Sequence, residues 1–400
     1  MEKGRSIDLY KELNPPRRIL MGPGPSDVHP AVLQSMATPL VGHLDPAFLE
    51  IMNETMDLLR QVYQTENKVT LAMSGTGSAG METLFVNLVE PGDKVIIGVN
   101  GLFGQRMVEV ASRCGAEVIQ VKSEWGDIIH PEKIEEALKQ HENIKLVAVV
   151  HSETSTGVRQ PLSELSEIVH RYHSLFVCDM VTSIGGIPTK IDEYGIDAAY
   201  SGTQKCLSAP PGLAPVTLSE RAVEVLAKRK NKVQSWYLDL SMIQNYWSEE
   251  RFYHHTAPIS MIYSLREALR IIVNEGLENV FKRHALYGEA LHAGLEAMGL
   301  ELLVNEEHRL HQLTAVRIPN NIQDADIRKR LLQKYGLEIG GGLGDLKGKI
   351  WRIGLMGYNA RQENVTYLLA ALEDVLREQG YHFISGAALE AANRYIRENE

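Results

Sequence analysis

The sequence has 400 residues, of which 44% are hydrophobic and 23% are charged, so the chain can bury a large core. Its formal net charge of -10, without a dense block of lysine and arginine, argues against a nucleic-acid-binding surface. Three widely spaced cysteines favour neither a disulfide framework nor a zinc site, and no apolar run is long enough to span a membrane. We therefore expect a cytoplasmic protein.

In chain order, residues 1–17 end in Asn14-Pro15-Pro16-Arg17, which predicts an extended arm because proline does not fit a helix interior. A helix is predicted over residues 48–63, and another begins after the glycine-rich residues 74–77. Short apolar runs then alternate with amphipathic segments. Strands are predicted at residues 94–99, 117–121, 145–150, 175–178, 196–200 and 214–218, with helices at 105–114, 131–139 and 162–173.

The last third of the chain changes character, with two predicted helices, 262–275 and 277–298, separated at Gly276. Strands at 312–318 and 350–354 then alternate with helices at 324–335 and 362–379. This order predicts an α/β fold: a large domain with a mostly parallel sheet flanked by helices, followed by a smaller C-terminal α+β domain. The predicted parts are an arm (1–17), a large cofactor-binding domain (18–275), a small domain (276–383) and a polar helical tail (384–400).

Lys205 is the first candidate for chemistry, because it follows a predicted strand and no carboxylate lies between residues 201 and 212. Burial without a nearby anion lowers the pKa of a lysine and makes it a nucleophile. A surface lysine on a loop is the alternative. Arg352 is a second candidate, because an arginine inside an apolar strand needs a partner. That partner is either a protein carboxylate or the carboxylate of a substrate.

Two further features lie on predicted strand ends. Glycines and hydroxyls at residues 74–77 open a helix and offer N–H groups to a phosphate, although the same residues also form ordinary turns and caps. Asp179 ends an apolar strand, where its carboxylate can hold a cation, a metal or a protonated ring nitrogen, or can cap the next segment. Together with Lys205, these features match the three requirements of pyridoxal 5'-phosphate. The fourteen histidines show no zinc-binding spacing, so no metal site is predicted.

From about residue 14 to residue 379 the chain resembles the class V, fold-type I aminotransferases, above all the alanine–glyoxylate and serine–pyruvate (serine–glyoxylate) aminotransferase group. The resemblance rests on the following segments: Gly22-Pro23-Gly24-Pro25, Ser74-Gly75-Thr76-Gly77, Asn100-Gly101-Leu102-Phe103-Gly104-Gln105-Arg106, Glu153-Thr154-Ser155-Thr156-Gly157-Val158, Tyr200-Ser201-Gly202-Thr203-Gln204-Lys205, Tyr253-His254-His255-Thr256 and Arg352-Ile353-Gly354.

The resemblance implies that Lys205 carries the cofactor as a Schiff base and moves the proton between the substrate Cα and the cofactor, while Asp179 pairs with the pyridine N–H. The other implied cofactor contacts are Gly75, Thr76, Gly77 and Gln204 at the phosphate, Phe103 and Val181 at the ring faces and Thr154 near the ring hydroxyl. Tyr253 and Thr256 would reach the phosphate from the other subunit, so the resemblance implies a homodimer with shared active sites. The implied substrate contacts are Arg352, Gly24 and His43.

The implied reaction moves an amino group from alanine or serine to glyoxylate or pyruvate. Phe103 stands where relatives often have Trp, and Ser78 where some have His. An (S)-ureidoglycine–glyoxylate aminotransferase of purine catabolism is the alternative, although His43 favours the alanine/serine group. A lyase or desulfurase would need a reactive cysteine on a mobile loop, which neither Cys114 nor Cys206 suggests. A regulatory protein that keeps the fold is the non-enzyme alternative, and it would not need Lys205, Asp179 and Arg352 together.

Overall fold

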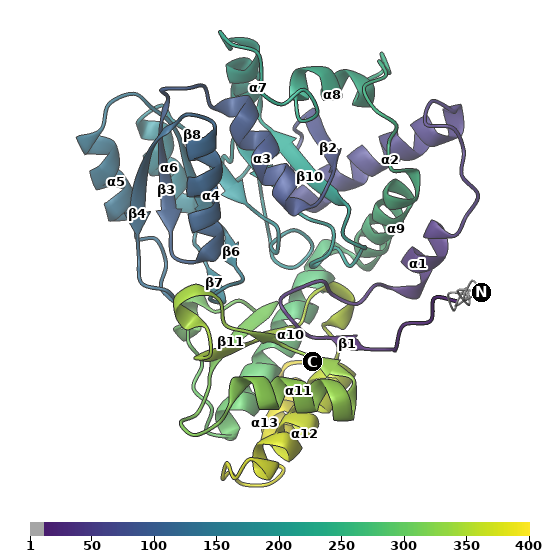
Figure 1. Cartoon of the computed structure of the whole chain (residues 1–400), viewed down its shortest axis with the longest axis vertical. Coiled ribbons are helices and arrows are strands. Elements are labelled where there is room, and N and C mark those ends of the chain that lie inside the picture. Colours follow the sequence, from purple (N-terminus) through teal and green to yellow (C-terminus); the bar gives the residue numbers. More distant parts are fainter. Residues whose placement is uncertain (1–11) are drawn as a thin grey trace, which may run out of the picture.

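The computed structural model describes residues 12–400 (Figure 1). The predicted arm at residues 1–17 therefore lies mostly outside the described residues. Residues 12–17 are exposed and form neither helix nor strand. Within the described part, no helix combines the length and the apolar character that crossing a membrane requires.

A seven-stranded sheet forms the centre of the larger part of the molecule (Figure 1). Only one strand, the second in the spatial order, runs antiparallel to its neighbours, so the predicted mostly parallel sheet is confirmed. In spatial order the strands are β2 (Val69–Ser74), β10 (Leu213–Leu218), β9 (Ala198–Tyr200), β8 (Leu175–Asp179), β5 (Ile144–Val150), β3 (Lys94–Val99) and β4 (Glu117–Lys122).

Helices surround this sheet because each strand of the parallel part is connected to the next by a crossover. One layer pairs α3 with α4, another pairs α5 with α6, and the long helices α2 and α9 lie side by side at the β2 end (Figure 1). The helices are α1 (Pro30–Met36), α2 (Pro46–Tyr63), α3 (Gly77–Leu88), α4 (Leu102–Arg113), α5 (Pro131–Gln140), α6 (Ser163–Arg171), α7 (Glu220–Ala227), α8 (Leu240–Trp247) and α9 (Ile259–Glu275). Strands β6 (Ser152–Glu153) and β7 (Val158–Arg159) form a hairpin next to the sheet.

The C-terminal part forms a second core around Trp351, which is fully buried. It begins at Gly276, where a φ of 84° separates α9 from α10, because glycine adopts this conformation without strain. Val280 of α10 still packs in the core of the larger part, whereas Ala290 and Leu291 pack in this second core. Its strands are β11 (Leu313–Arg317), β14 (Ile350–Gly354) and β13 (Gly340–Gly341), and its helices are α10 (Leu277–Ala297), α11 (Asp324–Tyr335), α12 (Gln362–Glu378) and α13 (Ala387–Asn399).

Both ends of the described chain join this second core. Strand β1 (Ile19–Leu20) pairs with β12 (Leu337–Glu338), and Met21 is buried in the same core. Helix α13, which lies within the predicted polar tail, buries Ala388, Ala392 and Ile396 against α10 and α12. The domain boundaries themselves remain predictions from the sequence.

Candidate active site

The C-terminal ends of the six strands that run in one direction meet at the same edge of the sheet. Open α/β sheets bind ligands at this edge. Strand β8 ends at Asp179, β9 leads within five residues to Lys205, and β2 leads directly to the glycine-rich loop. Phe103 lies in the first turn of α4, shortly after β3, and Thr154 lies in the turn between β6 and β7, shortly after β5. The topology therefore brings most of the predicted cofactor residues to one place.

Lys205 is buried, with 8% of its surface exposed. Its amine donates a hydrogen bond to the carbonyl oxygen of Pro23. Gly24 lies so close that an added Cβ would fall 2.7 Å from the lysine Nζ, which explains why a glycine is needed there. Burial, reinforced by the positive charge of Arg352, lowers the pKa of Lys205 to about 8. The sequence prediction of a desolvated lysine is therefore matched by the geometry.

Asp179 is 2% exposed and accepts two hydrogen bonds, one from the hydroxyl of Tyr200 (2.6 Å) and one from the backbone N–H of Val181 (2.9 Å). Burial raises its pKa to about 6, against the lowering effect of these two donors and of Lys205. Tyr200 is fully buried, and the sequence analysis gave it no role. In the sequence it is the last residue of an apolar strand and the first of the segment that leads to Lys205.

The loop between β2 and α3 has the shape of an anion site. The φ of Gly75 is 152°, and an added Cβ would lie 2.6 Å from the Cβ of Ala79. Thr76 precedes α3 without capping it through its side chain, so the first N–H groups of a twelve-residue helix remain available to an anion. Gly77 lies beside Val181 and Gly202, as the distances from an added Cβ (3.6 and 3.5 Å) show.

Gln204 lies at the same loop, where its buried side-chain oxygen has no partner among the described residues. That oxygen would be 2.8 Å from a Cβ added to Gly202, which neighbours Gly77. Phe103 is half-buried in the first turn of α4, and the guanidinium of Arg106 lies 5.0 Å from its ring centre. A buried, unsatisfied amide next to open helix N–H groups fits a polar ligand group.

Arg352 lies in β14 and is 6% exposed. It forms no ion pair among residues 12–400. Instead its Nε donates to the carbonyl of Gly341 (2.7 Å) and its Nη1 to the carbonyl of Thr154 (3.2 Å). These two bonds fix the guanidinium and leave Nη2 free to bind an anion. Of the two alternatives for this arginine, the structure therefore favours a ligand carboxylate over a protein carboxylate.

Three predicted residues, His43, Tyr253 and Thr256, form no side-chain hydrogen bond with this group among the described residues. Tyr253 is 60% exposed, and the ring of His43 is 5.3 Å from it. Thr256 is also exposed. His255, which follows His254 in the same segment, hydrogen-bonds Ser74 at the start of the glycine-rich loop (2.7 Å), a contact that the sequence analysis did not predict.

The residues at the sheet edge fit pyridoxal phosphate. The free helix N–H groups suit the phosphate, the remaining acceptor capacity of Asp179 suits a pyridine N–H, and the amine of Lys205 suits the aldehyde. No group of acidic, histidine or cysteine side chains in the described part is arranged to hold a metal ion. The three cysteines are all buried, and burial raises the pKa of Cys114 to about 11 and that of Cys206 to about 12. They are therefore poor nucleophiles, which argues against desulfurase chemistry.

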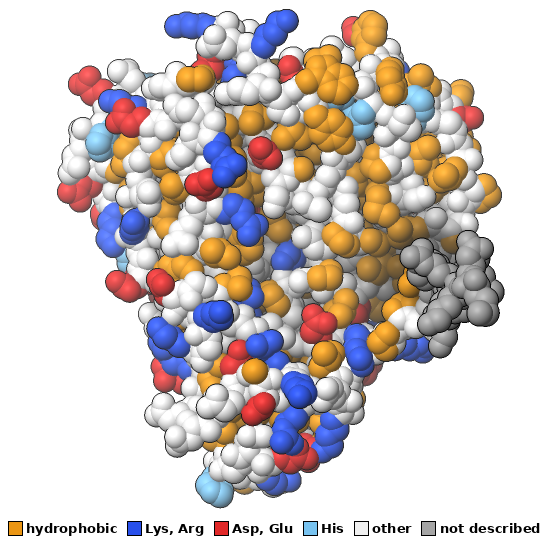
Figure 2. All heavy atoms as spheres, in the orientation of Figure 1, with side chains coloured by type: hydrophobic (Ala, Val, Ile, Leu, Met, Phe, Trp, Pro, Cys, Tyr) orange, Lys and Arg blue, Asp and Glu red, His pale blue; other side chains and the backbone are white. Residues whose placement is uncertain are grey.

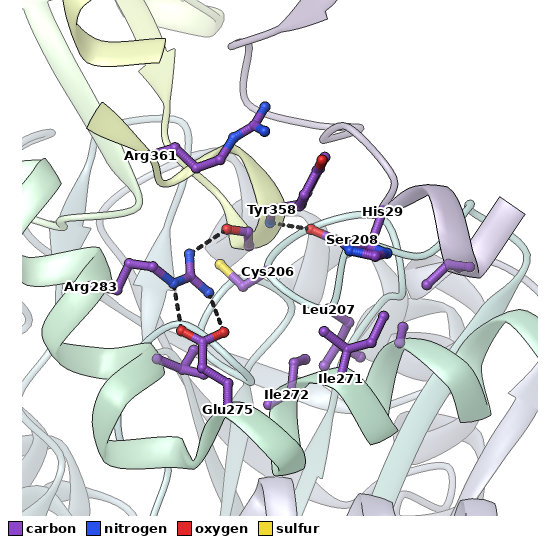
Figure 3. Close-up of a pocket in the computed structure, with 14 residues that line it drawn as sticks. His29, Cys206, Leu207, Ser208, Ile271, Ile272, Glu275, Arg283, Tyr358 and Arg361 are labelled. Atoms are coloured by element: carbon purple, nitrogen blue, oxygen red, sulfur yellow. Dashed lines mark hydrogen bonds and ion pairs between the residues drawn. The ribbon is translucent and has the colours of Figure 1, made fainter. Parts of the chain in front are cut away.

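A separate cavity of about 290 Å³ adjoins the backbone that follows Lys205 (Figure 3). Its floor is apolar and includes Ile271 and Ile272 of α9. Figure 3 shows the guanidinium of Arg283 facing Glu275, with bonds of 2.6 and 2.9 Å. None of the residues that line this cavity belongs to the glycine-rich loop or is Gln204, so it is separate from the anion site described above.

Comparison with known proteins agrees with this geometry. The family model described as aminotransferase class-V matches residues 26–368. The solved structure of ureidoglycine–glyoxylate aminotransferase from Bacillus subtilis is 45% identical, covers 97% of this chain and 100% of its own, and superposes with a TM-score of 0.95. That of alanine–glyoxylate aminotransferase from Nostoc sp. is 50% identical, covers 92% of this chain and 98% of its own, and has a TM-score of 0.91. Alanine–glyoxylate aminotransferase from Mus musculus is 41% identical over 92% of this chain and 90% of its own.

A buried amine, a buried carboxylate and an anion-binding loop at one edge of the sheet match the requirements of pyridoxal phosphate. The two solved structures named above have the same fold. The protein is a pyridoxal-phosphate-dependent aminotransferase of fold type I. The chain belongs to the class V aminotransferase family.

Proposed function

We propose that this aminotransferase moves an amino group from alanine or serine to a small 2-oxo acid, glyoxylate or pyruvate. The observation that carries the proposal is Arg352, which is held by two carbonyl groups, one of them that of Thr154, and keeps its Nη2 amino group free within residues 12–400. A fixed guanidinium near Lys205 suits the carboxylate that amino acids and 2-oxo acids share. The names of the relatives from Nostoc sp. and Mus musculus support alanine and glyoxylate.

Each residue has a defined task in this proposal. Bound pyridoxal phosphate supplies an electron sink for the negative charge that develops at the substrate Cα. The Lys205 amine, with a pKa of about 8, takes the proton from the substrate Cα and gives it to the cofactor. Asp179 holds a proton on the ring nitrogen, and Arg352 fixes the substrate by its carboxylate.

The alternative is (S)-ureidoglycine as the amino donor, which the name of the Bacillus subtilis relative supports. The identity to that structure is 45%, against 50% to the Nostoc sp. structure, and His43 stands in the loop before α2 as expected for the alanine/serine group. The two donors differ in side-chain size and hydrogen-bonding groups. A pocket built for one is therefore expected to discriminate against the other.

A donor panel tests the proposal. The holoenzyme is mixed with alanine, serine or (S)-ureidoglycine, and the loss of the cofactor's visible absorption is followed before glyoxylate or pyruvate is added. We expect alanine or serine to bleach the absorption and the 2-oxo acid to restore it. Faster bleaching by ureidoglycine would support the alternative, whereas bleaching that no 2-oxo acid reverses would contradict transamination. Lys205→Ala is the control that removes the absorption.

We also propose a homodimer in which each subunit completes the other's site. Exposed apolar residues support it, and Figure 2 shows hydrophobic side chains gathered on the upper right of the molecule, where α2, α8 and α9 lie in Figure 1. Such exposure on a soluble enzyme marks an interface. Between residues 33 and 44 and between residues 236 and 253, the exposed large hydrophobic residues are Leu33, Leu40, Leu44, Trp236, Tyr237, Met242, Phe252 and Tyr253.

Mixing two defective variants tests the shared site. One variant carries Lys205→Ala, and the other carries Tyr253→Ala with Thr256→Ala. If Tyr253 and Thr256 act across the interface, a hybrid dimer has one site with both defects and one intact site. Unfolding and refolding the two proteins together is then expected to restore activity. If they act within their own subunit, every site keeps a defect and no activity returns.

A cytoplasmic location is proposed from the three unpaired cysteines, because reducing compartments preserve free thiols. Fractionation of cells that express the protein tests it, and recovery with a membrane or secreted fraction would contradict it.

A further inference from the structure

Glu153 is a fully buried acidic residue that the proposed reaction does not use. It lies in β6, in the loop after β5, and therefore at the same sheet edge as Asp179 and Lys205. A buried carboxylate is costly unless hydrogen bonds or charges compensate it. Its surroundings therefore indicate what it does.

Four donors compensate this carboxylate. Oε1 accepts from the backbone N–H of Ser155 (3.0 Å) and from its hydroxyl (2.6 Å). Oε2 accepts from the N–H groups of Phe103 (3.1 Å) and Gly104 (3.4 Å), in the first turn of α4. The side chain of Glu153 thus joins the first turn of α4 to the turn between β6 and β7, two segments that are far apart in the sequence.

The hydrogen-bond donors around Glu153 suit a carboxylate. Burial and the negative charge of Asp179 raise the pKa of Glu153 above its usual value, although the hydrogen bonds from Ser155 and Phe103 act in the opposite direction. Three of the four contacts come from backbone N–H groups, which can only donate, whereas the Ser155 hydroxyl can donate or accept. The positive end of the α4 dipole also favours the anion. The cationic groups of Lys205 and Arg352 interact favourably with the same charge.

The carboxylate is also held sterically. A Cβ added to Gly101, the residue that precedes α4, would lie 2.4 Å from both Cγ and Cδ of Glu153. The φ of Gly101 is extended, so the glycine is needed for this close approach and not for its backbone conformation. Glu153 is therefore packed directly against the backbone that precedes α4.

The two segments joined by Glu153, the start of α4 and the turn between β6 and β7, carry the predicted contacts to the cofactor ring. Phe103 is the predicted stacking residue, and its own N–H is one of the four donors. Thr154, the predicted neighbour of the ring hydroxyl, lies between Glu153 and Ser155, and its carbonyl holds Arg352. We propose that Glu153 is the positioning residue of the cofactor pocket, setting Phe103 and the Thr154–Ser155 turn in register around the ring. The proposal rests on cofactor binding and not on the identity of the amino donor.

Glu153→Gln tests this proposal, because the amide keeps the shape but turns one pair of acceptor contacts into donor–donor contacts. Glu373→Gln is the matched control. Glu373 is also a buried glutamate that accepts a backbone N–H, from Gly386 at 3.1 Å, but it lies in α12 of the second core. Gly101→Ala is a second probe, since it displaces the Glu153 carboxylate without changing its charge. The readouts are the visible circular dichroism per bound cofactor, the cofactor dissociation constant of the apoenzyme, and kcat and KM.

We expect Glu153→Gln to bind the cofactor more weakly, to lose visible circular dichroism, and to lower kcat by about 10- to 100-fold with little change in KM. Gly101→Ala is expected to change the same quantities in the same direction, while Glu373→Gln leaves them at wild-type values. A purely structural role would instead lower the melting temperature and leave the dichroism and kcat of the folded fraction unchanged, which would overturn the proposal.

Should Glu153→Gln not fold, Ser155→Ala replaces it, because it removes the hydroxyl bond of 2.6 Å and keeps the buried charge. A smaller loss of circular dichroism and kcat is then expected. Wild-type values for both Ser155→Ala and Gly101→Ala would contradict the proposal.

Discussion

The state of the Lys205 amine before the cofactor binds is the prediction that the structure makes most directly. Only the free amine attacks an aldehyde. At pH 7 the shift from 10.5 to about 8 raises the free-amine fraction from roughly one in 3,000 to roughly one in 10, a gain of about 300-fold. Burial is the larger cause of this shift and the charge of Arg352 the second. The apoenzyme should therefore capture an aldehyde at neutral pH much faster than an ordinary lysine does.

The assay mixes apoenzyme with pyridoxal, which lacks the phosphate, and follows the visible absorption between about pH 6 and pH 10. The ε-amine of Nα-acetyl-lysine in solution provides the reference: its rate, divided by its own free-amine fraction at each pH, gives the titration of the aldehyde itself. After division by this reference, the rate for the apoenzyme is expected to rise with pH and to reach half its maximum near pH 8. Lys205→Ala should show no such phase.

Two charge changes make this prediction sharper. Arg352→Met removes a positive charge that lowers the pKa of Lys205, so the midpoint should move to higher pH. Asp179→Asn removes a negative charge that raises this pKa, so the midpoint should move to lower pH. Glu373→Gln, in the second core, should not move it. A wild-type midpoint equal to that of free lysine, or shifts of the same sign in both charge variants, would refute the reasoning.

Three further predictions follow from the same geometry. Tyr200→Phe removes a hydrogen bond that lowers the pKa of Asp179, so the acidic limb of the plot of kcat against pH should move to higher pH. An acidic limb at the wild-type pH would contradict this. Arg352→Lys keeps the charge but cannot hold both carbonyl groups, so KM should rise about tenfold or more for amino donor and 2-oxo acid alike, whereas a rise for one substrate alone would contradict a shared carboxylate site. Leu369→Ala opens a cavity at a fully buried position of the second core and should cost about 2–5 kcal/mol in urea unfolding, with kcat of the folded enzyme unchanged.

The regular elements were predictable where the sequence period was long enough to recognise. The predicted segments 94–99, 324–335 and 350–354 coincide with β3, α11 and β14. The sequence analysis missed α1, α7 and α8, which have seven or eight residues each. Two turns give too few repeats to establish a helical period. It also missed β2, because its apolar run merges with the glycine-rich loop that was assigned to the following helix.

The site was predictable to the extent that chain order determines it. Lys205 and Asp179 follow apolar strands, and parallel strands bring their C-terminal ends to one edge. Tyr200 and Glu153 were not assigned roles, because their importance depends on partners 21 and about 50 positions away in the chain. No local pattern distinguishes a tyrosine that donates to Asp179 from one that only fills the core.

The shifted pKa values of Asp179 and Lys205 also predict how the cofactor affects stability. The pKa of Asp179 is raised from 3.8 to about 6, so this group favours the folded apoenzyme below pH 3.8, and that contribution is lost as the pH rises towards 6. Above pH 6 the buried charge therefore costs the apoenzyme up to about 3 kcal/mol, which Asp179→Asn removes while its amide still pairs with Tyr200 and Val181. A ring N–H that binds this carboxylate offsets the same cost in the holoenzyme. Asp179→Asn should therefore raise the melting temperature of the apoenzyme at pH 7 and reduce the further rise on adding cofactor. Equal cofactor-induced rises in wild type and variant would show that Asp179 does not pair with the ring.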